Sequence, residues 1–200
     1  MTSASVPPVP EGAEDLERQE TGVQINALRN DADPAVRRYA AYLIGKARTP
    51  EAIVSLIEAL GDKDKSVREQ AMLALVATGK ATVGPLTDAM KDPKWETRYR
   101  AAEALGKLAD EKAVKPLLRG LQDNRDHVRY MAAKGLAVVG DSDAVDPLII
   151  LLKDENPFVR TMTTRALAAL GGKKVQAAIR AALLDETDER VRAAMTDALH

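Results

Sequence analysis

The chain has 200 residues and a formal net charge of −1 at pH 7, and 46% of its residues are hydrophobic although only 3% are aromatic. Its core must be built from alanine and aliphatic side chains, and the balanced charge selects neither nucleic acid nor an acidic membrane as a partner. The lack of cysteine excludes disulfides, thiolate catalysis and thiolate metal sites. No apolar run reaches the length of a membrane span and no secretory pattern opens the chain, so we expect a cytoplasmic protein.

Two segments precede the regular part of the sequence. Residues 1–15, "MTSASVPPVPEGAED", are rich in proline, serine and acidic residues, a composition that favours a flexible N-terminal extension. Residues 16–30 predict a helix that aligns poorly with the rest of the chain, so we expect it to be an N-terminal cap. The structured domain is therefore expected to cover residues 16–200.

From residue 31 onward the sequence repeats itself. A Val-Arg or Thr-Arg pair recurs every 30 to 32 residues, and an aspartate precedes each arginine by six positions, or by seven in the last copy, where Asp185 precedes Arg192. The arginines are Arg37, Arg68, Arg98, Arg129, Arg160 and Arg192, and the first five aspartates are Asp31, Asp62, Asp92, Asp123 and Asp154. A fixed period of this length is typical of repeat architectures.

Each repeat predicts two short helices. Behind every arginine the small and apolar residues keep helical spacing, as in "TRYRAAEALGKLA", and we call this the arginine helix. Another helix, the intervening helix, precedes the next aspartate, as in "KAVKPLLRGLQD"; prolines recur near its start, where a missing N–H is tolerated. Such pairs cannot bury their apolar faces alone, so the sequence predicts an all-α fold, an α-solenoid of stacked helix pairs.

The pattern D-x5-R, then "AAEALG", then G-D-x-x-A-V-x-P-L, best seen in "VGDSDAVDPLIILLKDENPFVR", resembles the HEAT-like repeats of the phycobilin lyase type. The resemblance covers about residues 24–200 and implies a right-handed superhelix of about 5.5 helical-hairpin repeats. It implies that aspartates and arginines of adjacent repeats bond to each other and to backbone N–H groups, which makes the arginines structural rather than phosphate ligands. It also implies that the arginine helices line a concave groove. Such repeats serve many proteins, so function does not follow from the fold.

The groove is the expected place for a partner. At about 100° per residue, all six aromatic side chains fall on the arginine-helix face away from the core or on its flanks. Aromatic residues on a groove are typical of protein interfaces. We predict a partner-binding surface made of Tyr39, Tyr42, Trp95, Tyr99, Tyr130 and Phe158, with His127, Arg100, Lys107, Lys134 and Arg165. Tyr39, Met131 and Met162 stand on the flank of this surface. For these three, packing between repeats is as good an expectation as exposure to a partner.

Two N-cap positions depart from the repeat. Four arginine helices have Asp33, Asp64, Asn156 and Asp188 at this position, whereas the two central ones have Lys94 and Arg125. Either a neighbouring aspartate caps these helices, or the two basic residues form the lip of a groove for an acidic partner.

These features favour a non-enzymatic adaptor that binds a protein or peptide. The sequence has no Gly-rich phosphate loop, no HExxH and no His-Glu pair of the kind found in HEAT-like di-iron hydroxylases, so we expect no enzyme, metal or cofactor. One alternative is the binding of a bilin or another tetrapyrrole, as in a lyase subunit. A second alternative is nucleic-acid binding through the concave face, although the mixed charge of the groove disfavours it. The half repeat at the C-terminus leaves self-association open.

Overall fold

The computed structural model describes residues 6–200, so the part of the expected flexible extension at residues 1–5 lies outside the described residues. The described chain is built from α-helices and short 3-10 helices, with no strand among residues 6–200. It divides into two compact units: unit 1 is Met1–Ala104 and unit 2 is Leu105–His200.

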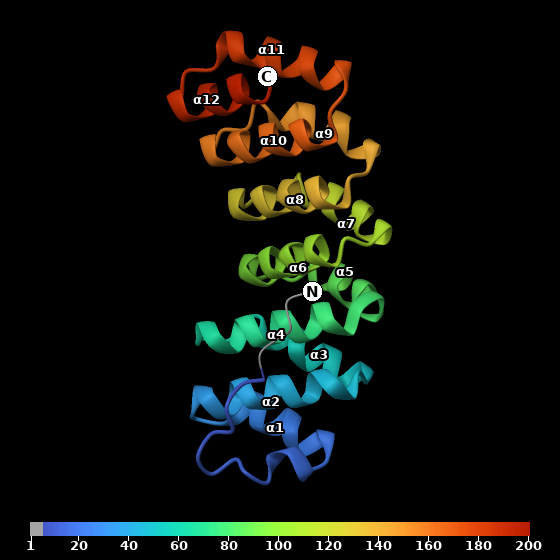
Figure 1. Ribbon diagram of the computed structural model, residues 1–200, viewed down its shortest axis with the longest axis vertical. Helices are drawn as coiled ribbons and strands as arrows, with labels where there is room; N and C mark the ends of the chain where they lie inside the picture. The colour runs from blue at the N-terminus through green and yellow to red at the C-terminus, as the bar shows by residue number, and fades with distance from the viewer. Residues whose placement is uncertain (1–5) are drawn as a thin grey trace. The chain divides into compact units, whose positions relative to one another are not determined.

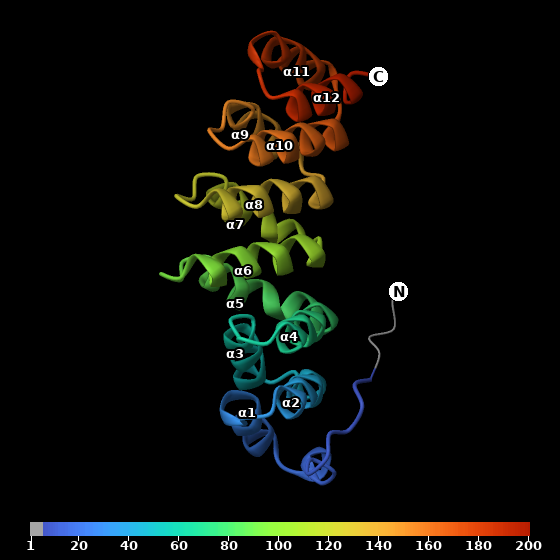
Figure 2. The same cartoon turned by 90° about the vertical axis from the view of Figure 1, so that its left-hand side faces the viewer.

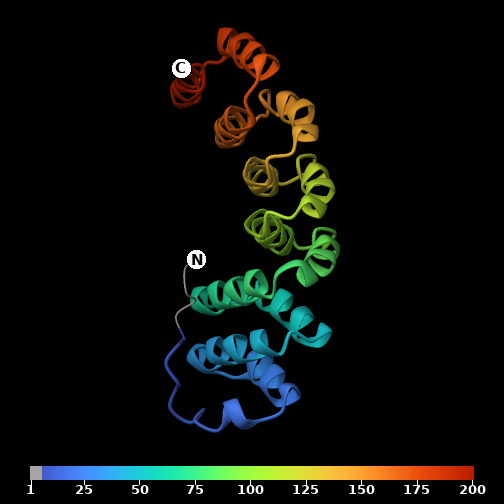
Figure 3. The same cartoon turned by 45° about the vertical axis from the view of Figure 1, so that its right-hand side comes forward.

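Unit 1 is a stack of helix pairs. Its elements are η1 (Leu16–Arg18), α1 (Thr21–Asn30), α2 (Pro34–Ala47), α3 (Pro50–Ala59), α4 (Lys65–Thr78), η2 (Gly79–Thr82), α5 (Val83–Ala89) and the first ten residues of α6 (Trp95–Leu108). The arginine helices α2 and α4 pack against each other, and the intervening helices α1, α3 and α5 form a second layer beside them (Figure 1, Figure 3).

Unit 2 repeats the same arrangement. After the end of α6 it contains η3 (Glu111–Ala113), α7 (Val114–Gly120), α8 (Asp126–Val139), η4 (Ser142–Ala144), α9 (Val145–Leu151), α10 (Pro157–Leu170), α11 (Lys173–Asp185) and α12 (Glu189–Asp197). The arginine helix α10 packs between α8 and α12, and α7, α9 and α11 form the other layer (Figure 3). The predicted all-α solenoid of stacked helix pairs is confirmed.

Short side chains let the arginine helices pack closely along their flanks. A Cβ on Gly45 of α2 would lie 2.7 Å from the Cβ of Ala74 on α4, and a Cβ on Gly106 of α6 would lie 2.7 Å from the Cα of Gly135 on α8. Such distances are below ordinary carbon contacts, so these glycines are required by the close approach of two helices. An arginine helix therefore buries two sets of positions. One set faces the intervening helices, and the other faces the neighbouring arginine helices.

Polar side chains fix where the arginine helices begin. The carboxylates of Asp33 and Asp64 accept the backbone N–H groups of Ala35 and Ser66, each at 2.8 Å. Arg125 makes no such bond at the start of α8. There the next residue, Asp126, accepts the backbone N–H of His127 at 2.7 Å, which supports the alternative that a neighbouring aspartate replaces the missing cap.

The N-terminal segment packs onto unit 1 earlier than the sequence predicts. Ala13 is 5% exposed and lies in one buried cluster with Tyr39 and Leu43 of α2, on which Leu16 also packs. The side-chain amide of Gln24 donates to the backbone carbonyls of Leu16 at 3.0 Å and Gln19 at 3.1 Å, which ties this segment to α1. Packing therefore starts before the expected boundary at residue 16. The segment runs along the side of α2 that faces away from α1 and α3 (Figure 2).

Candidate functional site

Arg37, Arg129 and Arg160 form complete rungs of an ion-pair ladder. Arg37 binds both carboxylate oxygens of Asp62, at 2.8 and 2.9 Å, and Arg129 binds both oxygens of Asp154, at 2.7 and 3.0 Å. Their Nη1 groups donate to backbone carbonyls of their own repeat, for example from Arg37 to Asp31 at 2.9 Å. These guanidinium groups are buried and bonded on both sides, so they hold adjacent repeats together and do not face a ligand.

The third rung corrects the sequence alignment. Arg160 binds the two carboxylate oxygens of Glu186 at 2.7 and 2.8 Å, whereas Asp185, the expected partner, is exposed. Glu186 stands six residues before Arg192, so the spacing of the repeat is kept and only the acid is longer. Its Oε1 also accepts the backbone N–H of Asp188 at 2.9 Å, as Asp62 does from Asp64 at 2.8 Å.

Arg68, Arg98 and Arg192 also make the backbone part of the rung. Arg68 donates to the carbonyls of Asp62 and Lys63 at 2.7 and 3.0 Å, and no carboxylate pairs with it among the described residues. Arg98 donates to the carbonyl of Asp92 at 2.9 Å, and Arg192 to that of Glu186 at 2.8 Å. The six arginines thus share the backbone bonds of the ladder, whereas Arg68 adds no ion pair among the described residues.

The ladder also sets the pKa values of its members. The hydrogen bond that Arg37 donates to Asp62 raises the pKa of Arg37 above its ordinary value. Burial raises the pKa of Asp62, but the bonds from Arg37 and from the Asp64 N–H outweigh it and leave the pKa below its ordinary value. The bond from Arg160 lowers the pKa of Glu186 in the same way. All three groups are therefore held in their charged forms.

On unit 1, the predicted partner surface is partly covered. Tyr39 is 3% exposed beneath Ala13, so the structure removes it from the accessible surface. Tyr42 is half-buried and its ring stacks on that of Tyr39, with centroids 6.3 Å apart. Lys46 places its Nζ 4.4 Å from the centroid of Tyr42 and 3.3 Å from Oε1 of Glu17. We call the N-terminal segment that packs on α2 the cover. It places the apolar Ala13 and Leu16 on the tyrosine rings and the acidic Glu17 beside Lys46.

Next to the cover lies an open pocket between α2 and α4. It has a volume of about 520 Å³ and is lined by Tyr42, Gly45, Lys46, Arg48, Gln70, Leu73, Ala74 and Ala77. Leu73 is 43% exposed, and it occupies the same place in its repeat as Tyr42 does. Leu73 was not predicted from the sequence because only aromatic and charged residues were considered at this position.

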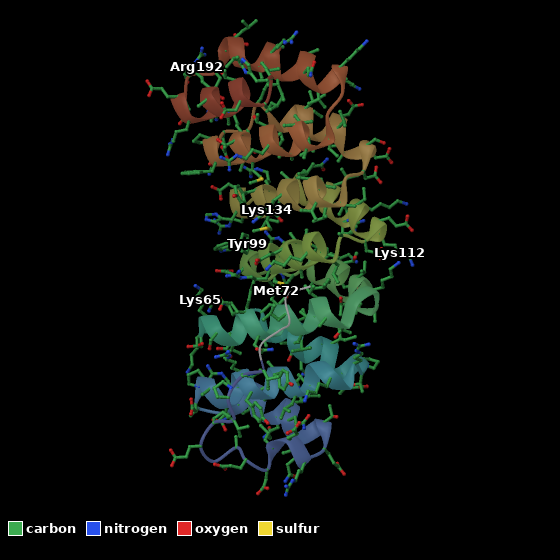
Figure 4. The ribbon with its side chains drawn as sticks, viewed as in Figure 1. Lys65, Met72, Tyr99, Lys112, Lys134 and Arg192 are labelled. Atoms are coloured by element: carbon green, nitrogen blue, oxygen red, sulfur yellow. The ribbon has the colours of Figure 1, made fainter. Side chains whose placement is uncertain are left out.

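At the start of α6, also in unit 1, Trp95 and Tyr99 meet edge to face, with centroids 6.5 Å apart and an angle of 71° between the rings. The guanidinium of Arg100 lies 5.0 Å from the centroid of Tyr99 and binds Glu103 at 2.9 Å (Tyr99 is labelled in Figure 4). Trp95, Tyr99 and Arg100 are all half-buried. They form a local aromatic and charged cluster on the arginine helix.

On unit 2, the predicted surface is open at α10. Phe158 is 60% exposed, and the guanidinium of Arg190, on α12, lies 5.2 Å from the centroid of its ring. Arg165 of the same helix and Lys134 of α8 are exposed, and Tyr130 is half-buried. Arg190 was not predicted, although it stands two residues before its ladder arginine, as Phe158 does.

His127 belongs to a polar cluster at the start of α8. Its Nδ1 lies 2.7 Å from the carboxylate of Asp126, and the side-chain amide of Asn156 donates to the same carboxylate. Burial raises the pKa of Asp126, but these bonds outweigh it and keep the pKa below its ordinary value. Asp126 is thus an ionised link between α8 and α10. Lys107, predicted for the same surface, is exposed near the end of α6.

The two predicted flanking methionines are not part of the surface. Met131 is 5% exposed and Met162 is 8% exposed, so both pack between arginine helices, as the alternative interpretation held. Tyr39 stands at the same position in its repeat. The flank is buried wherever a neighbouring element covers it, and for Tyr39 that element is the N-terminal segment.

Two larger pockets lie between intervening helices. One, of about 970 Å³, lies in unit 1 between α3, α5 and the start of α6, and the other, of about 600 Å³, lies in unit 2 between α9 and α11. None of the predicted partner-binding residues lines either pocket. Residues 6–200 contain no group of three or more side chains placed to hold a metal ion. No helix in the same range has the length and apolar character needed to cross a membrane.

The chain matches known proteins mainly through its repeats. A family model for HEAT repeats matches residues 23–86, 79–130 and 115–200. No curated protein sequence matches the chain. Among solved structures, the complex of CpcE and CpcF of phycocyanin lyase from Nostoc sp. PCC7120 is 22% identical and covers 74% of this chain and 98% of its own, with a TM-score of 0.68.

Two further structures show the same kind of likeness. Human deoxyhypusine hydroxylase, in complex with glycerol, is 25% identical over 90% of this chain and 72% of its own, with a TM-score of 0.52. A designed armadillo repeat protein in complex with the peptide (KR)4 is 18% identical over 91% of this chain and 100% of its own, with a TM-score of 0.55. These similarities describe the fold.

Proposed function

We propose that this chain, which belongs to the HEAT-repeat family, is a non-enzymatic adaptor that binds a protein or peptide segment on the faces of its arginine helices. The observation that carries the proposal is Phe158. It is a large apolar side chain that is 60% exposed on the arginine helix α10. The two helices that pack against α10 carry Tyr130, on α8, and Arg190, on α12, which offer further aromatic and cationic contacts. Aromatic and arginine side chains are the residues that most often dominate binding energy in interfaces.

Unit 1 supports the same proposal from within the chain. Its N-terminal segment already lies on the arginine helix α2, with Ala13 buried against Tyr39 and Glu17 bonded to Lys46. An arginine-helix face in this protein can therefore hold a chain segment that has little secondary structure of its own. The designed armadillo repeat protein that holds a peptide has a similar fold, which agrees with this use of stacked helices.

The proposal is tested by removing the exposed aromatic contact. We expect a tagged Tyr130→Ala/Phe158→Ala variant to keep the circular dichroism of the parent chain and to lose its partner in affinity purification from the native source. The matched control is Ile150→Ala/Leu184→Ala, which removes side chains that are 74% and 84% exposed on the intervening helices. The control should retain the partner. Equal recovery of the same partner with the aromatic variant would refute the proposal.

The two other ligand classes are tested with the same variants. The absorbance of a bilin should stay unchanged when the chain is added, and retention of the chain on DNA should be absent at physiological salt. A bilin signal or DNA retention that disappears in Tyr130→Ala/Phe158→Ala would replace the protein partner with that ligand.

A further inference from the structure

The cover on α2 shows what chemistry an arginine-helix face accepts. Residues 6–20, "VPPVPEGAEDLERQE", contain five acidic residues and one arginine. Within this segment Ala13 and Leu16 pack on the aromatic side chains of α2, and Glu17 reaches Lys46 at 3.3 Å. The segment therefore places apolar side chains on aromatic rings and a carboxylate on a neighbouring lysine.

The helix that receives this segment is basic. The sequence of α2, "PAVRRYAAYLIGKA", has three basic residues and no acidic one. Its ladder arginine is already paired with Asp62, so Lys46, one turn beyond Tyr42, is the cation that meets the cover. Opposite charges at an interface set orientation and suppress wrong partners, and the α2 cover follows this rule.

Unit 2 also carries an exposed aromatic ring and exposed basic side chains on its arginine helices. The sequence of α10, "PFVRTMTTRALAAL", again has no acidic residue, and the single acid of α8, Asp126, is already bonded to His127 and Asn156. On α8, Tyr130 and Lys134 have the four-residue spacing of Tyr42 and Lys46 on α2. Lys134 and Arg165 are exposed, and neither forms an ion pair among the described residues.

We infer that the surface formed by Tyr130, Lys134, Phe158 and Arg165 binds an acidic peptide segment in which apolar side chains stand next to carboxylates. The apolar side chains lie on Phe158 and Tyr130, and the carboxylates bind Lys134 and Arg165. This inference rests on the proposed function and adds the chemistry of the partner. The partner is a segment of another protein, because the chain's own acidic segment is held on α2 by Gln24 and Lys46.

The test uses a labelled peptide with the sequence of residues 6–20 as a probe of this chemistry. Fluorescence anisotropy of the peptide, titrated with the full chain, should show saturable binding. A peptide with Glu14→Gln, Asp15→Asn and Glu17→Gln should bind at least about tenfold more weakly, since each factor of ten is about 1.4 kcal/mol and the carboxylate contacts with Lys134 and Arg165 are lost. Binding should also weaken in high salt.

Charge reversal then locates the site. Lys134→Glu/Arg165→Glu should weaken peptide binding at least about tenfold. Lys112→Glu/Lys115→Glu, with the same change of charge on exposed residues at η3 and α7, should not; in Figure 4 Lys112 lies at the right-hand edge, apart from Lys134. All four side chains are exposed, so circular dichroism and the melting temperature should match those of the parent chain. The peptide could also bind to α2 by displacing the chain's own residues 6–20. A Lys46→Glu variant detects such binding, because it removes the cation that pairs with Glu17.

The outcomes separate this inference from the proposed function. No saturable binding at millimolar peptide, equal binding by the peptide with the three substituted acids, or loss of binding in Lys46→Glu alone would overturn the inference. A native partner that is lost in Tyr130→Ala/Phe158→Ala but retained by Lys134→Glu/Arg165→Glu would leave the adaptor function standing and refute the acidic ligand. An oligonucleotide that displaces the labelled peptide at a lower concentration than the unlabelled peptide does would show that the surface binds nucleic acid instead.

Discussion

The two units share one framework and differ in what covers it. In unit 1 the arginine helix α2 lies beneath Ala13 and Leu16, and Tyr39 is 3% exposed. In unit 2 the arginine helix α10 has Phe158 at 60% exposure, with the guanidinium of Arg190 5.2 Å from the centroid of its ring. Met131 and Met162, which stand at the repeat position of Tyr39, are buried there without such a segment. Repetition of the sequence therefore fixes how the helices stack, while in unit 1 a segment outside the repeats adds its own cover to α2.

The largest change is expected from breaking the shared framework. Arg37→Met leaves the buried carboxylate of Asp62 without its cation, and removing one partner of a buried pair costs about 3 kcal/mol or more. Arg68→Met removes only bonds to backbone carbonyls and should cost clearly less. Urea unfolding of both variants, followed by circular dichroism, measures the difference. Equal losses would show that the ion pair adds nothing to the backbone bonds.

A smaller change is expected from removing the cover of unit 1. Ala13→Asp places a carboxylate against Tyr39 and Leu43, and the segment should detach because burying an unpaired charge costs more than its packing provides. We expect a loss of about 2 kcal/mol in the free energy of unfolding, since two small apolar contacts are given up. Hydrogen exchange should rise in α2 and stay unchanged in α10. Glu14→Ala, at an exposed position of the same segment, is the control.

Acid should weaken both units through the ladder. Asp62 and Glu186 have pKa values below their ordinary 3.8 and 4.5, because Arg37 and Arg160 bind their charged forms. A lowered pKa in the folded state contributes stability above the ordinary value, and this stability is lost as pH falls through the lowered value. Melting temperatures should therefore fall below about pH 4.5, and the fall should be smaller in Glu186→Gln, which has no carboxylate to protonate there. An identical pH profile in this variant would contradict the assignment of Glu186 to the ladder.

The smallest expected change is a gain in the free energy of unfolding, from a substitution in unit 2. The hydroxyl of Thr163 is buried without a hydrogen-bond partner, at a repeat position where Ala40, Ala71, Ala101 and Ala132 stand in other copies. Thr163→Ala removes the unsatisfied group and improves helix propensity, so we expect stabilisation of about 0.5 to 1 kcal/mol. Thermal unfolding measures it, with Thr164→Ala as the control, because the Thr164 hydroxyl donates to the Arg160 carbonyl at 2.9 Å. A lower melting temperature for Thr163→Ala would show that the methyl group matters more than the hydroxyl.

Much of the framework was predictable because it is written several times in the sequence. The helical spacing of the apolar residues predicted both helices of each repeat, and the resemblance to HEAT-like repeats implied the pairs between aspartates and arginines of adjacent repeats. The last rung was misassigned because only aspartates were compared, although Glu186 keeps the six-residue spacing. The burial of Tyr39, Met131 and Met162 was left open because helical periodicity describes one helix and does not include the helices packed on its flanks.

The sequence by itself determined the all-α repeat, the periodic aspartates and arginines, and the position of every aromatic side chain on an arginine helix, since these depend on local spacing and residue type. Only the tertiary structure decided which of those side chains are accessible. Tyr39 is covered by Ala13, Tyr42 is half-covered and Phe158 is open, although all three stand on arginine helices. The reason is physical: exposure depends on what packs against a side chain, and Ala13 comes from a segment that has no counterpart in the repeats.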